Sequence, residues 1–339
     1  MRLSNEIEFL KMKGYSATPK IVQMEVTREC PLSCPQCYKD LSGKKHMDIE
    51  ILRVFLKQFS EIAPLALMIN GGEPLLYPYI EELLYYIKKS EINGYIYTSG
   101  VNIENFEPKI FESINIDISL NGSKEEINRL SRDGFTVSMD AIQFLHDNGI
   151  DYGITWVARH DNILDFPNML MLAEENGANH IQIIESKIKN TGDAMKALSK
   201  DDYMQLVGYI HEYESKSHTV QIYRQQCFAF LRIAEKKRYA DIFNGCMSGI
   251  LSCAINLEGD FLPCMHLPYP EKAISLKDYW YNSSKLNKLR LSKYEKIEDC
   301  IGCKYIEYCH FCRATEELTC KDFSKGPRNC QLKECINII

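Results

Sequence analysis

Apolar, β-branched segments alternate with segments of helical apolar spacing along the first half of this 339-residue chain. The strand-like segments are residues 21–27, 66–70, 94–98, 114–119, 151–157 and 180–186. Apolar side chains recur at helical intervals in residues 48–59, 79–90, 137–147 and 164–176. Because strands that alternate with helices pair in parallel, the pattern predicts an α/β sheet, either an open wound sheet or a partial (β/α)6 barrel of the TIM type.

Chemistry in a parallel α/β fold gathers at the carboxyl ends of the strands. Cysteines follow the first predicted strand and glycines follow the second. Later in the chain, residues 254–264 predict a hairpin that turns at Glu258 and Gly259. We therefore expect a barrel domain at residues 1–190, a helical bridge at 191–245 and a small cysteine-rich domain at 246–339.

Charge and hydropathy exclude several classes of partner. The formal net charge is −6, so no basic excess favours nucleic acid or an anionic membrane surface. The N-terminal segment lacks the apolar core of a signal peptide, and no stretch approaches the roughly 20 apolar residues that span a bilayer. We expect a cytoplasmic protein without a nucleic-acid or membrane partner.

Fourteen cysteines are the exceptional part of the composition. Three lie between Cys30 and Cys37, none follow until Cys227, and the others lie between Cys246 and Cys335. In a reducing cytosol such thiols more often bind metals or catalyse than form structural disulfides. The two cysteine-rich segments are therefore the candidate metal sites.

Cys30, Cys34 and Cys37 place three soft ligands on one short loop after the first strand. Three thiolates suit an iron-sulfur cluster with one open iron. A structural zinc ion would need a fourth ligand, which His46 could supply. An odd trio fits a disulfide poorly.

The C-x3-C-x2-C spacing resembles the signature of the radical S-adenosylmethionine (SAM) superfamily. The resemblance implies a [4Fe-4S] cluster on these cysteines, with SAM bound to the fourth iron. One electron then cleaves the cofactor to a 5′-deoxyadenosyl radical, which abstracts hydrogen from the substrate. Many members have an aromatic residue before the third cysteine, whereas this chain has Gln36 there and Tyr38 after it, so Tyr38 is our candidate for contact with the cofactor.

A Gly-Gly-Glu-Pro sequence follows the second strand as Gly71, Gly72, Glu73 and Pro74. The glycines allow close backbone approach, and Glu73 offers an acceptor for a cationic group. Alone, the segment would be an ordinary tight turn. By resemblance to the GGEP motif, it binds the amino group of the methionine moiety of SAM.

Further polar residues follow later strands. Ser99, Ser119 and Asn121 present groups that could bind a ribose or carboxylate, although caps or Asx turns would also explain them. By resemblance, Ser119 and Asn121 belong to the fourth-strand motif, and Arg132 meets the cofactor carboxylate, with a solvated helix arginine as the alternative. The same resemblance implies that Val157 occupies the place that faces adenine.

Eight C-terminal cysteines could ligate two four-iron clusters, or two or more zinc ions in closed sites. Their spacing, with Gly259 five residues before Cys264, resembles the SPASM domain of peptide-modifying radical enzymes. The resemblance assigns Cys246, Cys253, Cys264 and Cys312 to auxiliary cluster I, and Cys300, Cys303, Cys309 and Cys330 to auxiliary cluster II, for three [4Fe-4S] clusters in all. Cys227 is our candidate hydrogen donor, while Cys320 and Cys335 stay unassigned or replace Cys330.

The leading hypothesis is an oxidoreductase that installs a thioether or carbon-carbon cross-link in a ribosomally made precursor peptide. Peptide epimerisation, formylglycine formation by a sulfatase maturase, and biosynthesis of a small-molecule cofactor are alternatives, as is a non-catalytic metal-binding module. Sulfatase maturases typically carry a catalytic aspartate where this chain has Met265, with His266 beside it. The expected partners are an electron donor such as flavodoxin or ferredoxin and, because only 29 residues precede Cys30, an optional leader-recognition protein.

Overall fold

One mostly parallel sheet organises the chain in the computed structural model, which describes residues 3–43, 45–187, 197–225, 246–267, 269–291, 298–303 and 312–314. Its strands are β1 (Ile21–Thr27), β2 (Ala66–Gly71), β3 (Asn93–Thr98), β4 (Ile114–Ser119), β5 (Tyr152–Ala158), β6 (His180–Glu185), β7 (Gln221–Arg224), β8 (Ser252–Ile255) and β9 (Phe261–Leu262). Their order is β7-β6-β5-β4-β3-β2-β1-β8-β9, and only the β8–β9 pair is antiparallel. The fold is the expected partial barrel.

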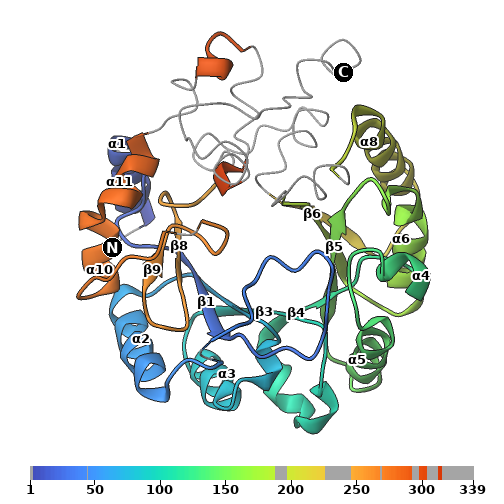
Figure 1. The fold of residues 1–339 in the computed structure, drawn as a ribbon, viewed down its shortest axis with the longest axis horizontal. Helices are drawn as coiled ribbons and strands as arrows, with labels where there is room; N and C mark the ends of the chain where they lie inside the picture. Colours follow the sequence, from blue (N-terminus) through green and yellow to red (C-terminus); the bar gives the residue numbers. More distant parts are fainter. Residues whose placement is uncertain are drawn as a thin grey trace.

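Helices surround the strands on the outside of an open ring (Figure 1). They are α1 (Leu3–Lys13), α2 (Ile49–Ile62), α3 (Ile80–Lys89), α4 (Glu125–Asn128), α5 (Phe135–Asp147), α6 (Phe166–Glu175), α8 (Lys200–Glu214), α10 (Leu276–Asn282) and α11 (Ser284–Leu291). In α2 the buried residues Leu52, Phe55, Leu56 and Phe59 follow the i, i+3, i+4, i+7 spacing, which places them on one face. Burial of such faces against the sheet is what holds these helices in place.

Each strand of the barrel has an outer and an inner side. On β4, Ile116 and Ile118 are buried in the apolar core between sheet and helices. Successive side chains of a strand point to opposite sides, so Asp117 and Ser119 lie on the inner side of the ring. The inner side of β4 therefore carries polar groups.

The six predicted strands are confirmed within one or two residues, and so is the hairpin. Its strands pair Ala254 with Leu262, and Gly259 takes the left-handed conformation (φ 85°) that the turn requires. Strand β7 is a correction, because residues 221–224 lie in the segment expected to be a helical bridge. With four residues at the sheet edge and only Ile222 buried, its apolar signal is too short to recognise.

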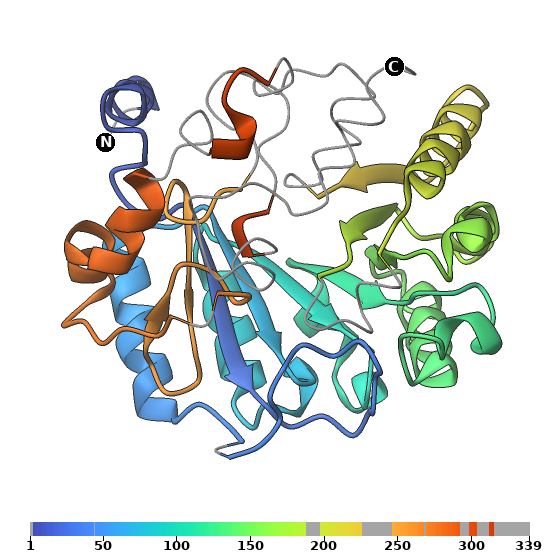
Figure 2. The same cartoon turned by 45° about the horizontal axis from the view of Figure 1, so that its top comes forward.

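Strands β8 and β9 come from the segment expected to form a separate cysteine-rich domain, yet β8 pairs in parallel with β1. The two segments are thus joined through one sheet (Figure 2). The division of the chain at residues 190 and 245 stays a prediction. Within the described part of the chain, no helix is both long and apolar enough to cross a membrane.

Candidate cofactor and cluster site

The loop after β1 carries the first three cysteines. Cys30 and Cys34 are half-buried and Cys37 is exposed. The backbone N–H of Cys37 donates to the carbonyl of Cys34 at 3.0 Å, which closes a turn between them. Burial raises the pKa of the Cys30 thiol, a hydrogen bond with the Leu32 backbone lowers it, and the negative charges of Glu73, Cys34 and Cys37 raise it further. The loop thus gathers three thiols, and the surroundings of Cys30 disfavour its thiolate form.

Residues 131–134, which follow about a hundred positions later in the sequence, hold this loop in place. The N–H of Ser33 donates to the Asp133 carboxylate at 3.0 Å, and the N–H of Gln36 donates to the Ser131 carbonyl at 3.1 Å. The N–H of Asp133 lies 3.4 Å from Cys34 Sγ. Segment 131–134 therefore fixes the backbone of the cysteine loop and aims one N–H at a thiol.

The paired glycines let the chain after β2 lie against the start of the cysteine loop. The N–H of Gly72 donates to the Thr27 carbonyl, and that of Glu73 to the Glu29 carbonyl, each at 2.7 Å. A Cβ atom on Gly71 would lie 2.7 Å from the Thr27 oxygen, and one on Gly72 would lie 2.5 Å from the Glu29 oxygen. No larger residue fits at either position. These glycines therefore hold the cysteine loop in place, in addition to any contact with a cofactor.

The Glu73 carboxylate is buried and already has four donors. It accepts hydrogen bonds from the Thr98 and Ser99 hydroxyls, from the Ser99 N–H at 2.8 Å and from the Leu75 N–H at 3.2 Å. Pro74 follows as the first residue of a short 3-10 helix. Glu73 and Ser99, both expected at the cofactor, therefore join the ends of β2 and β3 to each other.

Asn121 similarly joins the ends of β4 and β5. Its side chain accepts from the Val157 N–H at 3.0 Å and donates to Ser131 Oγ at 2.9 Å, while its own N–H donates to Asn128 at 2.8 Å. Ser119 is buried two residues earlier, on the inner side of β4. The structure thus brings Ser119, Asn121 and Val157 to one rim, with the Asn121 amide engaged by protein.

Two buried polar atoms near the cysteine loop have no hydrogen-bond partner within the described chain: Arg132 Nε and Gln36 Oε1. Burying such atoms unpaired is costly, so they indicate a missing polar partner. A guanidinium suits a carboxylate, and an amide oxygen suits an amino or hydroxyl donor. Together with three thiols on one loop, these groups fit an iron-sulfur cluster and a zwitterionic cofactor.

His46 is the residue that could have closed a zinc site, and the structure assigns it another role. Its Nδ1 lies 3.0 Å from the Thr27 hydroxyl and its Nε2 lies 2.9 Å from the Glu29 carboxylate. Both ring nitrogens are thus engaged beside the cluster loop. Among the residues that the structure describes, no set of three or more His, Cys, Asp or Glu side chains is arranged to hold a single metal ion.

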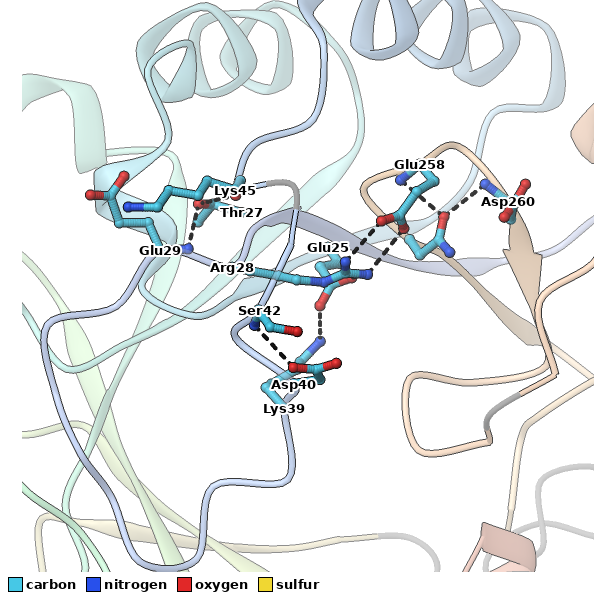
Figure 3. A network of polar contacts seen from close by, with 11 residues as sticks. Glu25, Thr27, Arg28, Glu29, Lys39, Asp40, Ser42, Lys45, Glu258 and Asp260 are labelled. Carbon is cyan, nitrogen blue, oxygen red and sulfur yellow. Dashed lines mark hydrogen bonds and ion pairs between the residues drawn. The ribbon is translucent and has the colours of Figure 1, made fainter.

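An ion-pair network connects the cysteine loop to the β8–β9 hairpin (Figure 3). On the inner side of β1, the buried Glu25 accepts from Lys39 Nζ at 2.8 Å and lies 3.5 Å from Arg28. The Arg28 guanidinium also binds both oxygens of Glu258 at 2.8 and 3.0 Å. Residues on both sides of the cysteine loop are thereby tied to the turn that precedes Cys264.

Tyr38 provides a second connection between these segments. Its ring lies 4.3 Å from the ring of His266, centroid to centroid, and Lys39 Nζ lies 5.3 Å from the Tyr38 centroid. Tyr38 was expected at the cofactor, and the structure places it between the cysteine loop and the C-terminal cysteines. The segment around His266 and the cysteine loop therefore face each other.

Three of the four cysteines expected for auxiliary cluster I come together. Cys264 and Cys312 share a small apolar cluster with Leu267 and Leu289. Burial raises the pKa of Cys264, and the charges of Cys246 and Cys312 raise it further, to about 12. Burial and the charge of Cys312 also raise the pKa of Cys246.

Cys253 is not in this group. It is fully buried in β8, where it pairs with Val22 and faces the main core between sheet and helices. Burial raises its pKa, and the charge of Arg290 lowers it. Strand alternation explains the difference from the expected ligand set, because residue 253 takes a core position of β8.

Two cysteines of the second auxiliary set are described. Cys300 and Cys303 are half-buried and lie on one turn, with the Cys303 N–H donating to the Cys300 carbonyl at 3.0 Å. The other expected or unassigned cysteines, Cys227, Cys309, Cys320, Cys330 and Cys335, lie outside the described residues.

Sequence reasoning missed Glu185, the last residue of β6. Its carboxylate accepts from the Tyr203 hydroxyl at 3.0 Å and lies 3.9 Å from Lys187 Nζ. Burial raises the pKa of Glu185, Lys187 lowers it and Cys312 raises it. The one available signal was an acidic residue at a strand end, which is weak because strand ends often carry charges.

Comparison with known proteins gives a family match over part of the chain. The Radical SAM superfamily matches residues 24–173. Among curated proteins, an AdoMet-dependent heme synthase of Methanosarcina barkeri is 23% identical over 94% of this chain and 98% of its own length. A PqqA peptide cyclase of Gluconobacter oxydans is 24% identical over 84% of this chain and 83% of its own.

Solved structures share the fold over nearly the whole chain. Streptococcus suis SuiB bound to S-adenosylmethionine superposes with a TM-score of 0.79 at 18% identity, covering 95% of this chain and 79% of SuiB. The protein anSMEcpe with bound AdoMet superposes with a TM-score of 0.71 at 17% identity, covering 94% and 98%. At such identities the likeness concerns the fold alone.

Proposed function

We propose, from the premise that this chain is a radical S-adenosylmethionine enzyme, that it installs a thioether or carbon-carbon cross-link in a ribosomally made peptide. The observation that carries this proposal is the joining of the cysteine loop to a second group of cysteines through Tyr38 and His266. Such a second cluster next to the first could accept the electron that cross-linking releases. The PqqA peptide cyclases and the structure of SuiB bound to precursor peptide SuiA support a peptide as the substrate.

Cys30, Cys34 and Cys37 would hold the [4Fe-4S] cluster through their thiolates. Once bound, the cluster and S-adenosylmethionine would supply a 5′-deoxyadenosyl radical for hydrogen abstraction. Arg132 would pair with the cofactor carboxylate, and the Gln36 amide oxygen would accept from a cofactor N–H or O–H group. The N–H of Asp133, directed at Cys34 Sγ, would donate to a bound thiolate and so favour the charged form.

For the auxiliary clusters, Cys246, Cys264 and Cys312 would bind one cluster, and Cys300 and Cys303 with Cys309 and Cys330 would bind the other. Cys227 stays our candidate hydrogen donor. A flavodoxin or ferredoxin would deliver the first electron. A separate protein could recognise the leader of the precursor peptide.

The second candidate function is biosynthesis of a small-molecule cofactor. The heme synthase of Methanosarcina barkeri favours it, because the two chains match over almost their whole lengths. Formylglycine formation is less favoured, since Met265 has no group that accepts a proton and its N–H donates to Gln23. Peptide epimerisation would need a hydrogen donor, for which Cys227 is the candidate.

The deciding experiment uses protein reconstituted anaerobically with iron and sulfide. Three four-iron clusters correspond to about twelve irons per chain, and reduction with S-adenosylmethionine present should give 5′-deoxyadenosine. The reconstituted protein is then offered a short peptide encoded beside its gene, or iron coproporphyrin III, the porphyrin named in a relative that is 21% identical, the Fe-coproporphyrin III synthase of Methanosarcina barkeri. Loss of two hydrogens from the peptide supports cross-linking and an unchanged mass with an inverted residue supports epimerisation, whereas turnover of the porphyrin alone would refute the peptide proposal.

A further inference from the structure

Asp117 on β4 and His180 on β6 form an ion pair across the strand between them. His180 Nε2 lies 2.8 Å from Asp117 Oδ1, and their side chains are 20% and 7% exposed. The pair passes over Gly153 of β5, where a Cβ atom would lie 2.2 Å from the imidazole and 2.6 Å from the carboxylate. Only glycine at this position lets the two residues meet.

The pair lies on the inner side of the barrel. Its neighbours along β6, Ile181 and Ile183, are buried in the core on the outer side, so His180 points inward. In the sheet register, Asp117 is paired with Gly153, and Gly153 with His180. Figure 1 shows β4, β5 and β6 side by side on the inside of the ring.

The strand register also fixes the depth of the pair. Ser119, on the same side of β4 and at the rim of the candidate cofactor site, lies two residues beyond Asp117, or about 7 Å along the strand. The pair is thus one pleat below Ser119 on β4, and Gly153, at the same level on β5, is two pleats below Val157. His180 is the first residue of β6, and its side chain remains partly exposed.

The groups that face the pair are few. The Thr155 hydroxyl donates to Asp117 Oδ2 at 3.3 Å. Burial raises the pKa of Tyr97, and the charges of Asp117 and Tyr95 raise it further, so Tyr97 stays a neutral phenol. The ring of Tyr223 lies 4.8 Å from that of His180. Asp117 is therefore the charged group that faces the imidazole in this part of the chain.

Nε2 is the ring nitrogen that faces the Asp117 carboxylate, so Nδ1 is the nitrogen left for a substrate. Within the described residues, Nδ1 has no protein partner. A histidine oriented by a buried carboxylate in this way is the usual form of a general base. Nothing in the site described above uses it.

We propose that His180 accepts a proton from the substrate, and that Asp117 orients the imidazole. The inference rests on the proposed peptide cross-linking. In that reaction one hydrogen atom leaves a substrate carbon for the deoxyadenosyl radical. When the second group attacks, the new bond forms, its S–H or C–H proton passes to His180 Nδ1, and the remaining electron passes to an iron-sulfur cluster.

The test uses the reconstituted enzyme and a perdeuterated copy of the peptide encoded beside its gene. Deuterium in 5′-deoxyadenosine reports hydrogen abstraction, and the peptide mass reports cross-linking. In His180→Ala, abstraction should stay within about twofold of wild type while cross-linking falls about 100-fold, a typical contribution of a general base. Added imidazole should restore cross-linking, because it can occupy the space that the side chain leaves.

Asp117→Asn should lower cross-linking about tenfold without rescue by imidazole, since the base is still present but poorly oriented. His211→Ala, an exposed histidine on α8, is the matched control and should behave as wild type. His180→Gln serves as a second variant if the alanine variant folds poorly. Cross-linking at the wild-type rate in both His180 variants, parallel loss of abstraction, or no rescue would overturn the role of His180. A wild-type enzyme that leaves the peptide unchanged would instead overturn the proposed function.

Discussion

The Asp133 carboxylate accepts a hydrogen bond from the backbone N–H of Ser33 at 3.0 Å, so a residue after β4 holds the cysteine loop after β1. We predict that Asp133→Ala loosens this loop. The lost bond is charge-assisted but exposed, so the cost should be about 1 kcal/mol. Release of cluster iron to a chelator should become several-fold faster at an unchanged initial iron content.

Asp140→Ala is the matched control for this substitution, because Asp140 is also exposed and lies nearby on α5. It should release iron at the wild-type rate. Equal rates in Asp133→Ala and wild type would show that the hydrogen bond to Ser33 does not restrain the cluster loop.

Glu73→Gln should lower the stability of the whole barrel in addition to weakening cofactor binding. All four partners of the carboxylate are donors, and a glutamine amide would turn its NH2 group toward some of them. Leaving buried donors unpaired should lower the free energy of unfolding by about 2 to 3 kcal/mol. Urea unfolding of the cluster-free protein measures this, with the exposed Glu91→Gln as the control. A stable variant that fails only to bind cofactor would contradict the structural role of Glu73.

Local pattern was enough to predict the neighbourhood of Cys30 and Gly72. Both follow apolar strands, and adjacent parallel strands bring their carboxyl ends together. The pairing of Ser33 with Asp133 was not predictable, because nothing in either segment encodes contact across a hundred residues. Gly153 was likewise unremarkable within its strand. The need for glycine at this position becomes apparent only when the strand register places His180 and Asp117 on either side of it.

His160 offers a prediction about pH. Its hydrogen bond to Asp202 at 2.8 Å, together with the charge of that residue, raises the pKa of His160 above its usual value. A raised pKa in the folded state means that the pair stabilises the protein while the imidazole is charged, and that this contribution is lost as pH rises through the folded pKa. Since His160 is 60% exposed, the contribution should be only about 0.5 kcal/mol.

The measurement compares the melting temperatures of wild type and His160→Gln at pH 6 and at pH 8.5. The deficit of the variant should be present at pH 6 and vanish at pH 8.5. In an Asp202→Asn background, the same substitution should show no such pH dependence. A deficit that grows with pH would contradict the direction of the shift.

The position of Cys253 in the sheet differs from the ligand role expected for it. The resemblance to the SPASM domain implies that it is a ligand of auxiliary cluster I, whereas β8 places it in the core beside Val22, apart from Cys246, Cys264 and Cys312. We predict that Cys253→Ala keeps the wild-type content of about twelve irons, while Cys264→Ala loses about four. The small cavity in the core should cost Cys253→Ala about 1 kcal/mol of stability. If the two variants lost iron equally, Cys253 would be a ligand after all, and β8 would have to rearrange when the cluster assembles.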